Sequence, residues 1–185
     1  RLSTDPAYDQ TAFEALLEIK GDSDHSKLIE MLEVLNDETS SMEDELFATY
    51  FDKENIAYMM AFQLLTGNTD TQNRNVYLYS PQNSSKWYLW DWDNDGMLRR
   101  REREIIKFSD SESWERGVSN YWGNILFRRC LQTQSYRNML DAAMKELYAY
   151  MNKTRIQSML EHYRSVTETY VWQMPDRMYV PITHA

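Results

Sequence analysis

The amino-acid sequence predicts a mainly α-helical fold that carries one small β-hairpin. Apolar residues recur at helical spacing in several stretches, whereas two short aromatic segments, separated by a polar loop, have the composition of strands. The chain of 185 residues contains only 5 Gly and 4 Pro, too few for a turn-dense β-sandwich. Its 42% hydrophobic and 26% charged residues are ordinary for a globular domain with one sizeable core.

Two stretches in the first half have the pattern of amphipathic helices. In residues 27–35, apolar side chains fall on one helical face. From Asp52 to Gly67 the apolar pattern is denser and covers most sides, which predicts a buried, central helix. Asp52 is suited to cap the start of this helix, and Gly67 stands where a helix often ends. Residues 12–20 fit either a helix or a strand, because so short a segment does not settle the period.

The second half begins with the predicted hairpin. Residues 75–79 and 86–90 are aromatic strand segments, and the polar loop between them has turn composition. The stretch at 99–118 is charged and Ser-rich, and we expect it to be irregular. Three helical patterns follow, at about residues 120–131, 136–151 and 154–172. We therefore predict a single domain over residues 1–185.

Composition and charge argue against several classes of function. The 29 acidic and 20 basic residues give a net charge of −9, which disfavours binding to nucleic acid. The single cysteine, Cys130, allows neither an internal disulfide nor a Cys-based zinc site. No apolar run approaches the roughly 18–20 residues of a membrane span, so we expect no span in this segment. The chain starts at Arg1 and ends abruptly at Ala185, and we expect it to be a piece of a longer protein.

The loop after the dense helix, residues 67–75, carries the sharpest chemical pattern. Asp70 and Asn75 lie five residues apart between a helix and a strand, which is the spacing of a kinase catalytic loop. In such a loop the Asp orients an attacking hydroxyl, and the Asn oxygen binds a metal ion on the nucleotide phosphates. The same residue types occur in polar loops whose side chains bond their own backbone, and spacing alone leaves both interpretations open.

A second acidic motif, residues 91–96, follows the second predicted strand. Asp91 lies sixteen residues beyond Asn75, where a kinase keeps its main magnesium ligand. Mg²⁺ needs only one or two carboxylates when phosphates and water supply the rest. Asp93 is the second choice, because strand alternation would turn it to the same side as Asp91. Four arginines within residues 99–103 either steer acidic or phosphorylated groups toward this site or form a solvated loop.

The same motif also fits a calcium-binding loop. Five residues occupy positions 1, 3, 5, 6 and 12 of an EF-hand loop, namely Asp91, Asp93, Asp95, Gly96 and Glu102. However, the entering segment is strand-like where an EF-hand has a helix, three arginines crowd the site, and the sequence has no second loop to pair with it. A calcium-stabilised domain is therefore the weaker alternative.

Taken together, these segments resemble the spore-coat CotH kinase family. The similar segments are residues 16–22, 50–52, 67–70, 75–79, 86–93, 124–131 and 136–137. They cover roughly two-thirds of the chain with order and spacing kept, and the two acidic motifs with an aromatic hairpin between them are specific in combination. The chain departs from the family at residues 95–97, where an aromatic-Gly pair is expected.

The resemblance implies the C-terminal lobe of an atypical protein-kinase-like fold, which transfers the γ-phosphoryl group of ATP to Ser or Thr of a protein substrate. The divalent cofactor would be Mg²⁺, with Mn²⁺ or Ca²⁺ as substitutes. In family terms, Asp70 is the catalytic acid, Asn75 binds the metal and the cofactor, and Asp91 or Asp93 is the main metal ligand. Family members are bacterial and are associated with spore coats or the cell surface, which is the expected localisation.

The resemblance leaves the other kinase lobe unaccounted for. The sequence has no Gly-rich phosphate loop, and no strand ahead of the catalytic loop carries a Lys placed to pair with ATP. Lys20 lies in the segment at about 12–22 that would form the hinge between lobes, so it is not assigned that role. We expect an N-terminal lobe of the same chain to be the missing partner and this piece alone to be inactive. A catalytically silent pseudokinase or surface interaction module is the alternative function.

Overall fold

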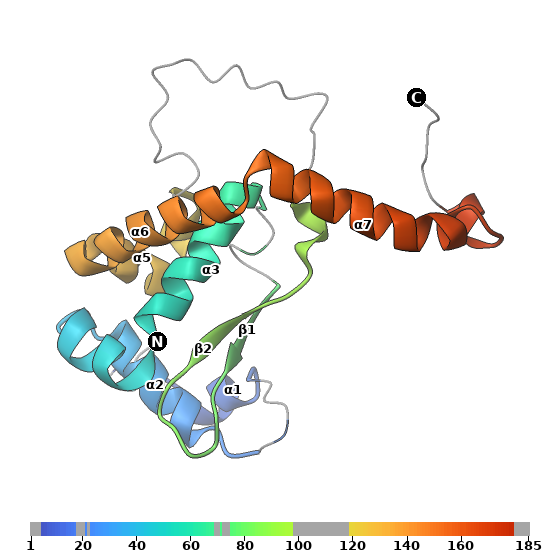
Figure 1. Cartoon of the computed structure of the whole chain (residues 1–185). Helices are drawn as coiled ribbons and strands as arrows, with labels where there is room; N and C mark the ends of the chain where they lie inside the picture. The colour runs from blue at the N-terminus through green and yellow to red at the C-terminus, as the bar shows by residue number, and fades with distance from the viewer. Residues whose placement is uncertain are drawn as a thin grey trace. The chain divides into compact units, whose positions relative to one another are not determined.

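A computed structural model of the chain describes residues 5–17, 21, 23–68, 71, 75–97 and 119–179. These residues divide between two compact units, Arg1–Met144 and Lys145–Ala185. Helices dominate the described residues, and the described strands form a single antiparallel hairpin (Figure 1). The predicted class, mainly α with one small hairpin, is confirmed.

The first unit is organised around one buried helix. The described α-helices ahead of the hairpin are α1 (Gln10–Glu14), α2 (Ser26–Asn36) and α3 (Lys53–Thr66). In α3, the Asp52 cap accepts a hydrogen bond from the backbone N–H of Asn55 at 2.8 Å, and the helix ends at Gly67 in the left-handed conformation (φ 65°). Ile56, Ala57, Met60 and Ala61 are buried. Both predicted ends of this helix are confirmed, and so is its burial.

A π-helix, η1 (Met42–Tyr50), lies directly before α3, and the sequence patterns do not predict it. The last carbonyls of a helix lack partners within it, so they need donors from elsewhere. Lys86 supplies one, because its ammonium donates to the carbonyl oxygens of Phe47 and, at 3.2 Å, of Phe51. The segment that leads into β2 is thereby tied to the end of η1.

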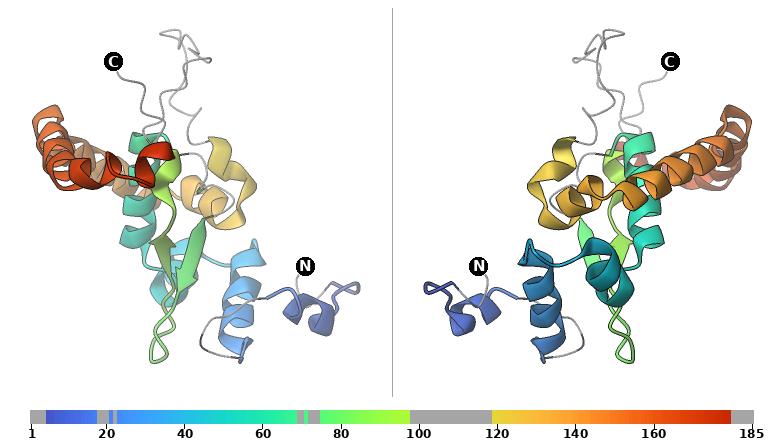
Figure 2. Two further views of the ribbon diagram at one scale, coloured as in Figure 1. Left: turned by 90° about the vertical axis from the view of Figure 1, so that its right-hand side faces the viewer. Right: turned by 90° about the vertical axis from the view of Figure 1, so that its left-hand side faces the viewer.

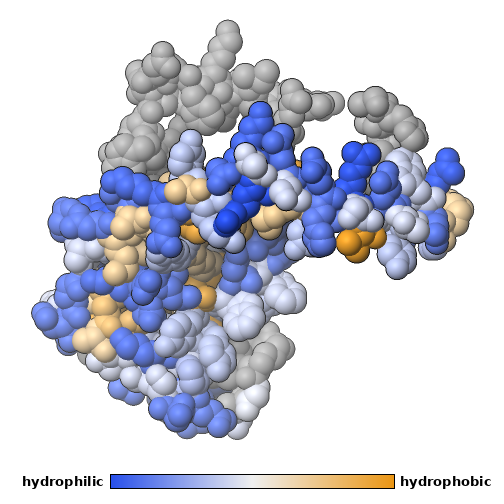
Figure 3. Space-filling model, in the orientation of Figure 1, coloured by the Kyte–Doolittle hydropathy of each residue, from blue (hydrophilic) through white to orange (hydrophobic). Residues whose placement is uncertain are grey.

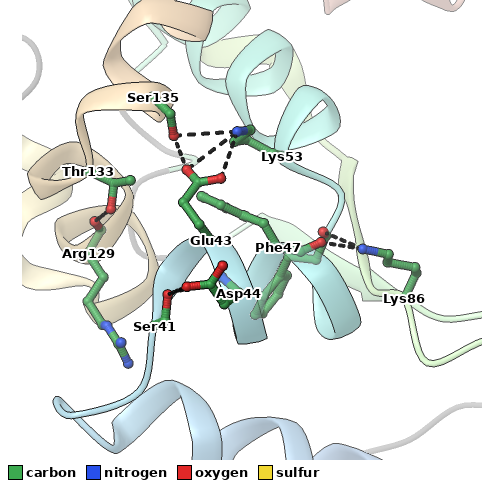
Figure 4. A network of polar contacts seen from close by, with 10 residues as sticks. Ser41, Glu43, Asp44, Phe47, Lys53, Lys86, Arg129, Thr133 and Ser135 are labelled. Carbon is green, nitrogen blue, oxygen red and sulfur yellow. Dashed lines mark hydrogen bonds and ion pairs between the residues drawn. The ribbon is translucent and has the colours of Figure 1, made fainter.

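Polar contacts also join η1 to its neighbours (Figure 4). Glu43 of η1 pairs with the ammonium of Lys53 at 3.1 Å and accepts a hydrogen bond from the hydroxyl of Ser135. Lys53 begins α3, and Ser135 lies in the first turn of α6 (Gln134–Tyr150). Three helices therefore converge on one carboxylate.

The hairpin consists of β1 (Val76–Tyr79) and β2 (Tyr88–Asp91), which pair from Val76 opposite Asp91 to Tyr79 opposite Tyr88. It lies beside α3 (Figures 1 and 2), where the side chain of Asn55 bonds both backbone groups of Leu89, at 2.8 Å to its N–H and 3.2 Å to its carbonyl. Four large aromatic residues of the hairpin and its exit are exposed, namely Tyr77, Tyr79, Trp90 and Trp92.

Helices after the hairpin complete the core of the first unit. A short 3-10 turn, η4 (Ser119–Gly123), leads into α5 (Ile125–Gln132), so the helix predicted at about 120–131 begins five residues later. The buried side chains of α5 and the first half of α6 are Leu126, Phe127, Cys130, Leu131, Tyr136, Leu140 and Ala143. Burial raises the pKa of the Cys130 thiol, as expected of a cysteine that packs in the core.

The second unit contains the end of α6, then α7 (Lys153–Val171) and a short turn, η5 (Asp176–Met178). The bounds of α6 and α7 match the two predicted helices within two residues. On the face shown in Figure 3, hydrophilic residues predominate and hydrophobic ones lie among them. Among the described residues, none of the helices has the length and apolar character that crossing a membrane requires.

The ambiguous segment at 12–20 is helical where it is described. Helix α1 covers Gln10–Glu14, and a turn follows it up to Leu17, while residues 18–20 lie outside the described residues. The charged stretch at 99–118 lies outside them as well, so its predicted irregular structure stays a prediction. The single-domain prediction also stays untested by this fold.

A buried guanidinium links α5 to the end of α2. Arg129 donates through Nη1 to the carbonyl oxygens of Leu35 (2.6 Å) and Asp37 (2.9 Å), and through Nη2 to the carbonyl of Ser40 (2.6 Å). A positive charge at the C-terminal end of α2 also interacts favourably with the helix dipole. Burial lowers the pKa of Arg129, yet an arginine stays protonated in a protein, so the charge persists.

We expect Arg129→Met to lower the free energy of unfolding by about 2–4 kcal/mol, because the buried carbonyls would lose their donors. The neighbouring Arg128 provides a matched control, since its side chain is more exposed and forms a 3.9 Å ion pair with the exposed Glu38. Arg128→Met should change stability by less than about 0.5 kcal/mol. Urea unfolding measures both, and equal losses would refute the role given to Arg129.

Candidate functional site

The site is built at the end of the hairpin where β2 terminates. Asp91 is the last residue of β2, and Val76, the first residue of β1, lies opposite it. Asn75 directly precedes Val76, so the register brings Asn75 and Asp91 to the same end of the hairpin. Asn75 is half-buried and has a left-handed backbone (φ 59°), a conformation that Asn tolerates better than most residues.

Two neutral amides hold the carboxylate of Asp91. Gln63, in the last turn of α3, donates from Nε2 to Oδ1 at 2.6 Å, and Asn94 donates from Nδ2 to Oδ2 at 2.8 Å. Among the described residues, no Lys, Arg or His forms an ion pair with Asp91. The carboxylate is therefore oriented at both oxygens, while none of the described cationic side chains cancels its negative charge.

The orientation of Asn94 is itself fixed. Its Oδ1 accepts hydrogen bonds from Gln63 Nε2 and from Asn68 Nδ2, both at 3.1 Å, so its Nδ2 must face Asp91. Asn68 follows the Gly67 cap and is buried. Amide contacts thus run from the first residues of the predicted catalytic loop to the predicted metal ligand.

Buried polar atoms without partners lie in the same region. Gln63 and Thr71 are almost fully buried, and neither Gln63 Oε1 nor Thr71 Oγ1 has a hydrogen-bond partner among the described residues. A buried polar group left unpaired costs about 1–3 kcal/mol, which makes such groups unusual outside functional sites. These unpaired buried atoms indicate that this end of the hairpin is a candidate functional site and not only a packing contact.

Tyr121, in η4, is a third buried group at this site. Burial raises the pKa of its hydroxyl to about 12, and the nearby charge of Asp91 contributes to the rise. The Thr71 hydroxyl lies close to that of Tyr121 and lowers the pKa of Tyr121 in part, although the two hydroxyls do not meet in full hydrogen-bond geometry. The ring of Tyr121 packs edge-on against Phe127 at 5.0 Å between centroids. Tyr121 is therefore protonated at neutral pH and has a hydroxyl proton to donate.

The structure corrects the argument that placed Asp93 beside Asp91. Strand β2 ends at Asp91, and Asp93 is exposed with a left-handed backbone (φ 56°), so strand alternation does not extend to it. The segment entering the proposed calcium loop is β2, whereas an EF-hand requires a helix there. Within the described part of the chain, no three His, Cys, Asp or Glu side chains gather into a metal-binding group.

Several predicted residues lie outside the described residues, and their placement stays a prediction. They are Lys20, Asp70, the arginines at 99–103 and Glu102. The direct chain neighbour of Asp70, Thr71, is described and fully buried.

The chemistry of the described residues fits a divalent cation bound together with phosphates. Each carboxylate oxygen of Asp91 accepts one amide hydrogen bond and retains further lone-pair capacity. One carboxylate and one amide oxygen are a sufficient protein contribution when phosphate oxygens and water complete the coordination of Mg²⁺.

Sequence reasoning missed Gln63, Asn68 and Tyr121. The signal that points to Gln63 is its position: it stands seven residues after Ile56, so it falls on the buried stripe of α3 although it is polar. A long polar side chain that follows apolar residues on the buried side of a helix indicates a specific polar partner, and here that partner is Asp91. No comparable periodic signal marks Asn68 or Tyr121, because the residues around them do not belong to a regular element of useful length.

Comparison with known proteins identifies the family of the chain. The family model described as CotH kinase protein matches residues 1–183, which is nearly the whole chain. No curated protein and no solved structure gives a significant match.

The raised pKa of Tyr121 predicts a stability change at high pH. The unfolded chain loses this proton near pH 10 and the folded chain near pH 12, so the folded state binds more protons between these values and stability falls as pH rises. We expect the contribution lost by pH 11 to be about 1 kcal/mol. Urea unfolding of wild type and Tyr121→Phe from pH 8 to 11.5 checks this. The Phe variant should lose less stability, and parallel curves would contradict the assignment.

Proposed function

The chain belongs to the CotH kinase family, and on that premise we propose that it forms the C-terminal lobe of an atypical protein kinase. The reaction is transfer of the ATP γ-phosphoryl group to a Ser or Thr hydroxyl of a protein substrate. The family is associated with spore coats, so coat or cell-surface proteins are the proposed substrates. An N-terminal lobe of the same protein would supply the rest of the nucleotide site.

The observation that carries the proposal is the state of Asp91. Its carboxylate is held at both oxygens by the neutral amides of Gln63 and Asn94, at 2.6 and 2.8 Å. A structural aspartate in a salt bridge would have its charge cancelled by an arginine or lysine. A carboxylate that is fixed in direction and keeps its charge is suited to bind a cation.

Each residue has a distinct proposed task. Asp70 orients the substrate hydroxyl and accepts its proton, while Asn75 and Asp91 hold the divalent cation together with the ATP phosphates. The cation, when bound, would neutralise charge on the transferring phosphoryl group. The hairpin contributes rigidity, because it fixes Asp91 and Asn75 at one end of a paired, helix-backed element.

We expect Asp70→Ala and Asp91→Ala, made in the longer protein, each to lower the rate of phosphoryl transfer at least ~100-fold, since each removes a group that acts on the reacting phosphate or hydroxyl. Asp95→Ala is the matched control, because Asp95 lies in the same acidic segment but is exposed. Asp93→Ala decides whether Asp93 shares the metal role. Transfer of radiolabelled γ-phosphate to a generic protein substrate provides the measurement.

Circular dichroism should show that all four variants keep the wild-type fold. Near-normal transfer by the Asp91 variant would remove its proposed role. A folded wild-type protein that transfers no phosphate to any substrate would favour the silent pseudokinase or interaction module instead.

A further inference from the structure

Asp91 depends for its direction on a residue in a different element. Gln63 lies in the last turn of α3 and is only 1% exposed, yet its amide reaches both Asp91 Oδ1 at 2.6 Å and Asn94 Oδ1 at 3.1 Å. One amide group therefore sets the position of the carboxylate directly and also fixes the second amide that holds the other oxygen.

The burial of an unpaired polar atom in the Gln63 side chain indicates that this residue has a role other than stability. Gln63 Oε1 is buried and has no partner among the described residues, so the side chain carries an unfavourable desolvation that an apolar residue would avoid. The buried residues that precede Gln63 on this face of α3, Ile56, Met59 and Met60, are apolar, and the hydroxyl of Thr66, which follows it, donates to the carbonyl of Phe62 within the helix. Stability alone would favour another apolar residue at this position.

A charged partner would hold Asp91 more strongly but would defeat cation binding. A lysine or arginine at position 63 would form a salt bridge with Asp91 and compete with any metal ion for the same oxygens. An amide orients the carboxylate through a neutral hydrogen bond and leaves its charge for the ion. Residues that orient metal ligands in this way typically change metal affinity by ~10–100-fold when mutated.

We propose that Gln63 is a positioning residue for the metal-binding carboxylate of Asp91, acting directly on Oδ1 and through Asn94 on Oδ2. This inference rests on the proposed function, since it requires Asp91 to bind a divalent cation. Gln63 contacts no substrate group in this role. Its effect is to hold the carboxylate in one rotamer, so that the ion does not have to overcome the entropy of ordering its ligand.

Asn55 offers a matched control on the same helix. It also bonds β2 through a side-chain amide, but its partners are the backbone groups of Leu89 and not the carboxylate of Asp91. A purely structural role for both amides predicts that Asn55→Leu and Gln63→Met lower Tm alike. The positioning role predicts a crossed result: Asn55→Leu lowers Tm by several degrees with unchanged metal binding, whereas Gln63→Met weakens metal binding and leaves Tm nearly unchanged.

The experiment titrates the chain with Mn²⁺ alone and follows paramagnetic broadening of the side-chain amide signals of Asn94 and Asn68 by NMR. We expect wild type to show broadening that Asp91→Ala abolishes, and Gln63→Met to need ~10–100-fold more Mn²⁺ for the same broadening. If Gln63→Met fails to fold, Asn94→Ala gives a second measurement. This variant removes the donor to Asp91 Oδ2, lies in a half-exposed turn, and is followed through the side-chain amide signal of Asn68.

The outcomes separate the two claims. The positioning role is overturned if wild type and Gln63→Met need the same Mn²⁺ concentration for broadening; Asp91 then remains a metal ligand. If Gln63→Met is unfolded, the same comparison is made between wild type and Asn94→Ala. No broadening in wild type, or broadening that survives Asp91→Ala, overturns the metal role of Asp91, and the positioning role falls with it.

Discussion

A two-stranded hairpin is too small to be stable in water by itself, and this constraint governs the architecture of the first unit. The hairpin persists because α3 holds the backbone of β2 through Asn55 at Leu89, while Gln63 of the same helix directs the carboxylate of Asp91 at the end of the strand. Helix α3 must in turn be rigid, and it is capped at both ends and buried along most of its length. The position of the candidate site is therefore set by a helix that contributes no proposed catalytic residue.

Electrostatic arrangement distinguishes this site from the structural charges elsewhere in the unit. The charge of Arg129 is solvated by backbone carbonyl oxygens, and the charge of Glu43 is paired with that of Lys53, so both charges are compensated by their surroundings. Asp91 receives only neutral donors among the described residues. Within the described part of the chain, charge is thus used in two ways: compensated charges join helices, whereas the carboxylate of Asp91 is oriented by neutral amides at the end of the hairpin.

The fold followed from the sequence where local signals were strong. The caps Asp52 and Gly67 and the dense apolar pattern between them define α3, and aromatic composition with a polar loop defines the hairpin. The π-helix η1 was not predictable, because its apolar residues follow neither the α-helical nor the strand period. The carbonyls at its end also depend on Lys86, which is distant in the sequence. For the same reason the contact between Gln63 and Asp91 could not be predicted: it joins residues 28 positions apart, and only the tertiary structure brings them together.

The left-handed backbone of Asn75 restricts how this position can evolve. Bulky or β-branched residues are strained at φ 59°, so few residue types apart from Gly, Asn and Asp fit there without cost. Glycine would preserve the turn and delete the amide oxygen, whereas most side chains with a suitable oxygen would distort the entry to β1. A homologue with Gly at this position would therefore keep the hairpin and lose the proposed metal ligand, which gives a simple sequence criterion for separating family members that carry the proposed site from those that retain only the scaffold.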